Sequence, residues 1–191
     1  MQLTQGNIVR DLWLFFAFYW LVTSMNVNKM RKREPWGQRL SFLLILAVGS
    51  FISIHVSERF GIPNRQFVPP LPWIKWLGIA LEAAGIAFAI WARNHIGKYW
   101  SASVSLREGH QLIRSGPYAR IRHPIYTGIL LGIAGTVLWA GTYGALVTFA
   151  FTLAALGYKA KKEETLLAGE FGAAFDEHRR RTGFLLPRLS A

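Results

Sequence analysis

Cysteine is missing from the sequence: none of the 191 residues carries a thiol. The chain can therefore form no disulfide, and it offers no thiolate for a metal ion or for nucleophilic catalysis. Carboxylates are scarce too, since 10 Asp and Glu stand against 22 Lys and Arg, for a formal net charge of +12. The HExxH, EF-hand, GxSxG and Walker patterns are also absent, so we predict no metal site, no serine-hydrolase site and no P-loop.

Apolar residues make up 52% of the chain and gather in long runs that alternate with basic stretches. This alternation is typical of a membrane protein with cationic loops. It leaves no separate basic groove, so we do not expect nucleic-acid binding. The first ten residues lack the basic region and cleavage site of a secretory signal, and we expect the first apolar run to remain in the mature protein.

Five apolar segments are long enough, or nearly so, to cross a hydrocarbon core that requires about 20 helical residues. They cover residues 8–26, 40–56, 73–91, 125–140 and 145–159. We therefore predict an all-α integral membrane protein that forms a single membrane domain over residues 1–191. Only residues 141–144 separate the last two segments, which predicts a helical hairpin, and amphipathic spacing after Lys162 predicts one further helix.

The distribution of basic residues predicts the orientation in the membrane. Residues 29–39, 93–122 and 159–188 together hold 18 of the 22 Lys and Arg. Five crossings place these three stretches on one side, which the positive-inside bias identifies as the cytoplasm. We thus expect the N-terminus outside and the C-terminal helix on the cytoplasmic side.

A polar cluster at residues 116–128 lies at the entrance of the fourth segment. Pro117 and Pro124 favour extended backbone at the residues before them, so this stretch cannot be one continuous helix. Pro124 suits a first helical turn, whose amides lie beside Arg122 and His123 and offer donors to an anion. We interpret the cluster as a ligand site, against the alternative of a basic patch that only sets topology and contacts lipid phosphate.

Two groups of carboxylates are candidates for function. Glu163 and Glu164 follow the fifth segment, and the hairpin would bring one of them near His123 to face a ligand; ordinary interfacial ion pairs are the alternative. Glu82 lies inside the third segment, where an acid is a functional candidate. Two glycines share its helix face, so a hydrogen bond across a tight helix contact explains it slightly better.

Several short motifs occur in a fixed order in the second half of the chain. They are His110-Gln111-Leu112-Ile113, Ser115-Gly116-Pro117-Tyr118, Arg122-His123-Pro124-x-Tyr126-x-Gly128, Glu163-Glu164-x-x-Leu167 and Phe171-Gly172. In combination, around a helical hairpin, they resemble the isoprenylcysteine carboxyl methyltransferase family, whose wider group includes phospholipid N-methyltransferases. The resemblance covers residues 91–187, and residues 91–101 look like the segment that precedes the pocket in bacterial relatives.

The resemblance implies an enzyme in the cytoplasmic membrane of a prokaryote that transfers a methyl group from S-adenosylmethionine, leaving S-adenosylhomocysteine. A lipophilic acceptor would enter from the bilayer, and the pocket would face the cytoplasm. Residues 8–92 would hold the first three spans, and residues 93–191 the cofactor-binding half. The residues that match the family's cofactor site are His110, Gln111, Leu112, Ile113, Tyr118, His123, Pro124, Ile125, Tyr126 and Glu163.

Two departures from the family pattern concern the acceptor. Lys159 stands where eukaryotic members have an arginine, and a lysine attracts a carboxylate without forming a bidentate pair. Phe175 and His178 stand where tyrosines often follow the Phe-Gly pair. We expect Glu163 to act at the cofactor and Lys159 or Arg93 to steer the carboxylate of an isoprenylcysteine-like acceptor.

Other functions stay open from the sequence. A phospholipid amine or a small thiol are alternative acceptors, and either must lose a proton to a nearby carboxylate or histidine before it attacks. A lipid-binding membrane scaffold is the non-enzymatic alternative. A small transporter with Glu82 as its coupling site is less compatible, because five short spans show no inverted repeat. The oligomeric state is not predicted.

Overall fold

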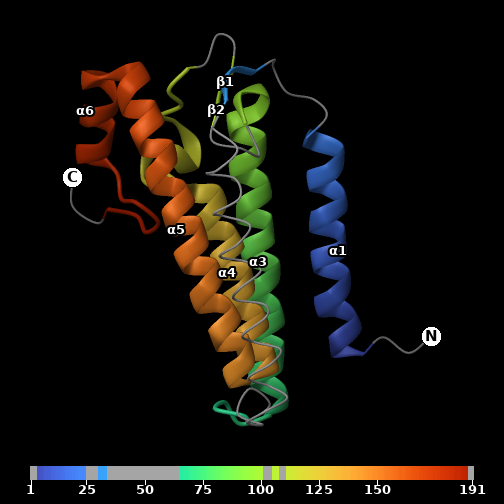
Figure 1. The fold of residues 1–191 in the computed structure, drawn as a ribbon. Helices are drawn as coiled ribbons and strands as arrows, with labels where there is room; N and C mark the ends of the chain where they lie inside the picture. The colour runs from blue at the N-terminus through green and yellow to red at the C-terminus, as the bar shows by residue number, and fades with distance from the viewer. Residues whose placement is uncertain (1–3, 25–29, 34–64, 101–104, 108–110, 189–191) are drawn as a thin grey trace.

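The computed structural model describes residues 4–24, 30–33, 65–100, 105–107 and 111–188, and these are almost entirely helical (Figure 1). The predicted second segment, residues 40–56, lies outside them. The elements are α1 (Gln5–Ser24), β1 (Met30–Arg33), α3 (Pro72–Ile96), η1 (Gly97–Tyr99), β2 (Ser105–Arg107), η2 (Gly116–Ala119), α4 (Pro124–Ala140), α5 (Tyr143–Phe171) and α6 (Ala173–Arg181).

Four long helices form a bundle, with α3, α4 and α5 side by side and α1 parallel to α3 (Figure 1). Phe16 of α1 packs on Ile86 and Ala89 of α3 in one buried cluster. At the end where both helices finish, Arg93 Nη2 donates to the Thr23 carbonyl over 2.8 Å. The C-terminal ends of α1 and α3 are thereby fixed together.

Glycines let α3 and α4 approach until their backbones touch. A Cβ placed on Gly78 would lie 2.7 Å from the Gly135 carbonyl oxygen, and one on Gly85 would lie 2.6 Å from the Gly128 carbonyl oxygen. These distances are too short for a side chain, so each position requires glycine. Close approach at small residues is the usual way in which membrane helices pack.

Glu82 lies in this same contact and is 0% exposed. Its Oε2 accepts a 2.9 Å hydrogen bond from the Thr136 hydroxyl of α4, and that hydroxyl accepts one of 3.0 Å from the Trp13 indole of α1. Three helices therefore meet at one polar chain. This arrangement agrees with the interpretation of Glu82 as a hydrogen-bonded packing residue.

The predicted hairpin is confirmed, and its second helix is longer than expected. Gly141 ends α4 at a φ of 67°, and the Thr142 side chain accepts from the Ala145 amide to begin α5. We expected this helix to end at residue 159 and a separate one to follow. That boundary is wrong: α5 runs unbroken to Phe171 and ends at Gly172, whose φ is 49°.

A short antiparallel pair of strands, β1 with β2, is the one departure from an all-α chain among the described residues. It joins two stretches that we predicted on the same side of the membrane, at the end of the bundle near η2 and α6 (Figure 1). In the described part of the chain, the helical stretch Pro72–Tyr99 is long and apolar enough to cross a membrane, and Pro124–Ala140 is apolar but shorter. The predicted count of five spans stays a prediction.

Candidate functional site

A pocket opens at the end of the bundle where α3 finishes and α4 begins. It contains about 890 Å³ of space, including its open mouth. Its lining is largely aromatic and aliphatic, with a few polar groups, and consists of Ile96, Tyr99, Trp100, Gln111, Leu112, Ile113, Tyr118, Arg122, His123, Ile125, Tyr126, Glu163, Leu166, Leu167, Phe175 and His178.

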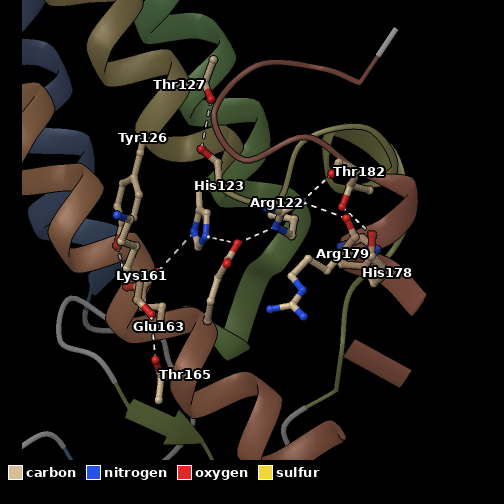
Figure 2. Close-up of polar contacts among 11 residues, drawn as sticks. Arg122, His123, Tyr126, Thr127, Lys161, Glu163, Thr165, His178, Arg179 and Thr182 are labelled. Atoms are coloured by element: carbon tan, nitrogen blue, oxygen red, sulfur yellow. Dashed lines mark hydrogen bonds and ion pairs between the residues drawn. The ribbon is translucent and has the colours of Figure 1, made fainter. Parts of the chain in front are cut away.

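His123 is the polar centre of the pocket, because it immediately precedes α4 and faces the C-terminal part of α5 (Figure 2). Its Nε2 lies 3.3 Å from Glu164 Oε1, and its Nδ1 lies 3.6 Å from Glu163 Oε2. The Tyr126 ring stacks on the imidazole, with centroids 5.6 Å apart, and its hydroxyl donates to Glu163 Oε1 over 2.5 Å. Both carboxylates after the fifth predicted segment therefore converge on His123.

Arg122 holds the neighbouring segments together around this centre (Figure 2). Its Nε donates to Glu164 Oε1 over 2.5 Å, and its Nη1 donates to the carbonyls of Arg179 and Thr182. One guanidinium thus connects α5, α6 and the chain after α6. A half-buried Arg–carboxylate contact of this kind is stronger than an exposed ion pair.

The segment that follows α6 closes one wall of the site. The amides of Arg122 and His123 donate to the carbonyls of Gly183 and Phe184 over 2.9 and 3.3 Å. The Phe184 ring meets the imidazole edge-on at 5.2 Å. The Thr127 hydroxyl also contacts the Leu185 carbonyl, at 2.6 Å. Because the backbone here is paired, the entrance of α4 has a fixed shape.

These surroundings change the protonation of the buried groups. Burial opposes a charge on His123, but its contacts with Glu163 and Glu164 outweigh this and raise its pKa above the ordinary value. Burial raises the pKa of Glu164, but the contacts with His123 and Arg122 outweigh this effect and lower the pKa below its ordinary value. The pKa of the Tyr118 hydroxyl is raised by burial and by the charge of Glu163, so it stays protonated. The site thus pairs cations with carboxylates at neutral pH.

Comparison with known families gives the same region of the chain. Residues 77–169 match the sequence model of the Isoprenylcysteine carboxyl methyltransferase (ICMT) family. Over these residues the chain is similar to the ICMT family. The match includes most of α3, all of α4 and most of α5, and it contains His123, Tyr126 and Glu163.

Curated relatives include both metal-resistance proteins and methyltransferases. The cobalt-zinc-cadmium resistance protein CzcN of Cupriavidus metallidurans is 39% identical over 62% of this chain and 53% of its own length. Methanethiol S-methyltransferase 2 of Bradyrhizobium diazoefficiens is 41% identical over 39% of this chain and 28% of its own. The Protein-S-isoprenylcysteine O-methyltransferase of Schizosaccharomyces pombe is 28% identical over 42% and 34%. The chain spans about half the length of CzcN and of a second metal-resistance relative, the nickel-cobalt-cadmium resistance protein NccN of Alcaligenes xylosoxydans xylosoxydans.

Most residues predicted for the ICMT cofactor site meet in the pocket. Gln111, Leu112, Ile113, Tyr118, His123, Ile125, Tyr126 and Glu163 all line it. Pro124 is fully buried behind them as the first residue of α4, and His110 lies outside the described residues. Their assignment to a cofactor stays a prediction.

Two residues predicted to steer the acceptor do not line the pocket. Arg93 is 3% exposed, stacks on Trp100 and donates to the carbonyls of Thr23 and Gly97. Lys159 lies one turn before Glu163, with Nζ 5.5 Å from the centroid of the Tyr126 ring. Their surroundings suit anchoring of helix ends for Arg93 and a cation–π contact with the Tyr126 ring for Lys159.

Part of the apolar wall was not among the residues predicted for the cofactor site. Ile96, Tyr99 and Trp100 come from the end of α3 and η1, and Leu166 and Leu167 come from the extension of α5. Once α5 is continuous, the helical spacing from Glu163 to Leu166 and Leu167 places all three on one face. A continuous helix was therefore the signal that could have found the two leucines.

Proposed function

We propose that this chain is a membrane methyltransferase that takes its methyl group from S-adenosylmethionine and passes it to a lipophilic acceptor at the cytoplasmic face. The observation that carries the proposal is the convergence of Tyr126, His123 and Glu163 in a mostly aromatic and aliphatic pocket. The match of residues 77–169 to the ICMT family model and the likeness to two methyltransferases support it.

The pocket residues fit the parts of S-adenosylmethionine. Glu163, whose side chain is 23% exposed, can accept from an ammonium or a ribose hydroxyl. The faces of Trp100, Tyr99 and Tyr118 suit both a flat base and a cationic sulfonium. When bound, the sulfonium supplies an activated methyl group, so the reaction requires no metal and no protein nucleophile.

The chain's own contribution would be binding, orientation and exclusion of water. Tyr126 and His123 hold Glu163 from two sides and fix its direction before any ligand arrives. The wall made by the segment after α6 keeps the α4 entrance closed to solvent on that side. Positioning of this kind can account for a large part of the acceleration of a displacement reaction.

The acceptor named by the family, an isoprenylcysteine carboxylate, stays a prediction for this chain. A phospholipid amine and a small thiol remain the alternatives, and a lipid-binding scaffold is the non-enzymatic one. The scaffold predicts no saturable binding of S-adenosylhomocysteine. The cytoplasmic orientation of the pocket is likewise a proposal.

Calorimetric titration of the detergent-purified full chain with S-adenosylhomocysteine tests the proposal. We expect saturable binding, and Glu163→Gln should weaken it about 10- to 100-fold, the usual cost of losing a hydrogen bond to a charged group. Glu170→Gln, an exposed position further along α5, is the matched control and should bind like the unchanged chain. No saturable binding by a folded sample would favour the scaffold.

A further inference from the structure

The pocket has no cation placed to receive a carboxylate acceptor among its described residues. Arg122 is the one Arg or Lys in the lining, and its side chain is 11% exposed. Its nitrogens already bind Glu164 and the carbonyls of Arg179 and Thr182. Releasing this guanidinium for an acceptor would leave a buried carboxylate without its partner, which is costly.

The other positive groups near the site are engaged elsewhere. Arg93 is held by two carbonyls behind Trp100, and Lys159 lies against the Tyr126 ring outside the lining. His123 lies between Glu163 and Glu164, which already balance its charge. An anionic acceptor would therefore find no protein cation in the described lining that is free to bind its carboxylate.

His178 gives the pocket a different chemical possibility. It projects from α6 into the lining and is 6% exposed. Among the described residues nothing hydrogen-bonds to its ring; the Thr182 hydroxyl bonds only to its backbone carbonyl. An imidazole that lines a cavity without a protein partner is free to exchange a proton with a ligand.

The groups that surround His178 keep its ring neutral. Burial is the largest influence and lowers its pKa, and the charges of Arg114, Arg122 and His123 act in the same direction. Glu164 on α5 is the one facing group that opposes them. The ring is therefore in its basic form at neutral pH, where it can accept a proton.

We infer, on the basis of the proposed function, that the acceptor is an apolar thiol and that His178 is the catalytic base that takes its proton. A thiol is neutral before reaction, which suits the apolar lining. An amine would arrive as an ammonium ion and would bring a second positive charge to a pocket that already holds a sulfonium.

The proton and electron balance of this step is complete. The acceptor's S–H bond breaks and its proton moves to a ring nitrogen of His178. The acceptor sulfur forms the new S–CH₃ bond while the bond between that methyl group and the donor sulfur breaks, and its electron pair stays on the donor sulfur. The products are a thioether, neutral S-adenosylhomocysteine and an imidazolium, which returns its proton to water.

Two acceptors of equal chain length distinguish the possibilities. The full chain in detergent is given labelled S-adenosylmethionine with either 1-decanethiol or decanoate, and we expect transfer to the thiol at least about 100-fold faster. His178→Gln, which keeps an amide of similar size but cannot accept the proton, should lower kcat for the thiol about 10²- to 10⁴-fold. The remaining rate should rise about tenfold per pH unit, because the thiol must then ionise in solution.

A spectroscopic readout separates a base from a structural residue. In ring-labelled histidine NMR of the full chain, one titration with a pKa below about 6.5 should disappear in His178→Gln. Preference for decanoate, or an unchanged pH profile in His178→Gln, would overturn the inference. The proposed methyltransferase function would survive either of these results if the unchanged chain binds S-adenosylhomocysteine in calorimetry. If the unchanged chain does not bind it, the proposed function itself is overturned.

Discussion

At the scale of single residues, His123 is the group whose charge most depends on its partners. Its imidazole is buried, yet two carboxylates and one arginine lie within the same contact network. Removing the charge of His123, of either glutamate or of the arginine would leave an unbalanced charge in a half-buried site, so these four side chains act as a unit. Single substitutions here should not be additive.

The raised pKa of His123 predicts a pH-dependent contribution to stability. Since the folded protein binds this proton more tightly than the unfolded chain, the contribution is complete below about pH 6.5, the unfolded pKa, and is lost as the pH rises through the folded pKa. Thermal unfolding of the unchanged chain and His123→Gln should therefore differ most at acidic pH. Each 1 kcal/mol lost moves the midpoint by about 2–4 °C.

The other shifted groups do not imitate this effect. The lowered pKa of Glu164 changes the stability only at acidic pH, near and below the ordinary pKa of a glutamate. The lowered pKa of His178 destabilises the folded protein below about pH 6.5, which is opposite in sign to the effect of His123. Because Glu164 is bonded to His123, the two proteins are compared above the acid range in which Glu164 takes up its proton. A difference in midpoint that grows with pH would contradict the protonated state of His123.

The polar chain through Thr136 predicts a second effect on stability. Thr136→Val removes the donor to Glu82 and the acceptor for the Trp13 indole, so we expect a loss of about 1–3 kcal/mol of unfolding free energy. Thr136→Ser keeps the hydroxyl and is the matched control. Equal unfolding midpoints for the two variants, measured in the same detergent, would show that the hydrogen bonds contribute nothing.

Residue types alone identified the polar centre of the site but not all its partners. His123 and the two glutamates stand out because charged groups at the ends of apolar helices are costly without a role. Arg93 shows what the residue type leaves out: its charge suggested a role at the acceptor, but it gave no sign of the carbonyl that Arg93 binds at the end of α1, 70 residues earlier. A partner so distant in sequence leaves no local pattern.

At the scale of secondary-structure elements, the contact between α3 and α4 is the tightest in the bundle. Gly78→Ala would place a Cβ 2.7 Å from both the Gly135 carbonyl oxygen and the Trp139 amide nitrogen. Backbone atoms cannot rotate away, so the helices must separate. We expect a loss of about 1–3 kcal/mol in unfolding free energy, measured by thermal or denaturant unfolding.

Gly169→Ala is the control for that substitution. Gly169 lies in α5, and a Cβ there would meet no described atom within 4 Å. Alanine is the better helix former by roughly 0.5–1 kcal/mol, so this change should leave the protein as stable as before or slightly more stable. If both alanine variants lost stability equally, close packing would not explain the need for Gly78.

The helices themselves followed from the sequence more completely than their ends did. Prolines at the starts of α3 and α4 and a glycine after α4 are strong local signals, and the hairpin followed from them. The charged run from Lys159 to Glu164 suggested a break because it is too polar to span a membrane. The run continues as helix because one face of α5 forms part of the pocket wall, a contact that the composition of the run does not predict.

At the scale of the whole molecule, the absence of cysteine makes the predicted orientation directly measurable. Gln66→Cys and Ala119→Cys introduce single thiols at exposed positions near opposite ends of the bundle. In sealed, right-side-out vesicles, a membrane-impermeant maleimide should label position 66 and should label position 119 only after the membrane is opened. This result is expected from the positive-inside distribution of Lys and Arg.

The unchanged chain provides the blank for this experiment, because it has no thiol to react. Labelling of both positions in sealed vesicles would contradict a membrane-spanning arrangement. Labelling of position 119 alone would reverse the orientation and place the pocket outside the cytoplasm. The pairing of β1 with β2 joins two stretches predicted on one side, which is consistent with the expected outcome.

The backbone pairing between residues 120–123 and residues 183–184 has a consequence for biosynthesis. During translation the α4 entrance is made first, and the segment that completes it follows about 60 residues later. A ribosome that stalls after α5 has been made would leave the hairpin formed but the wall beside His123 missing. The pocket is therefore complete only after residues 182–185 have been synthesised, and these residues follow α6.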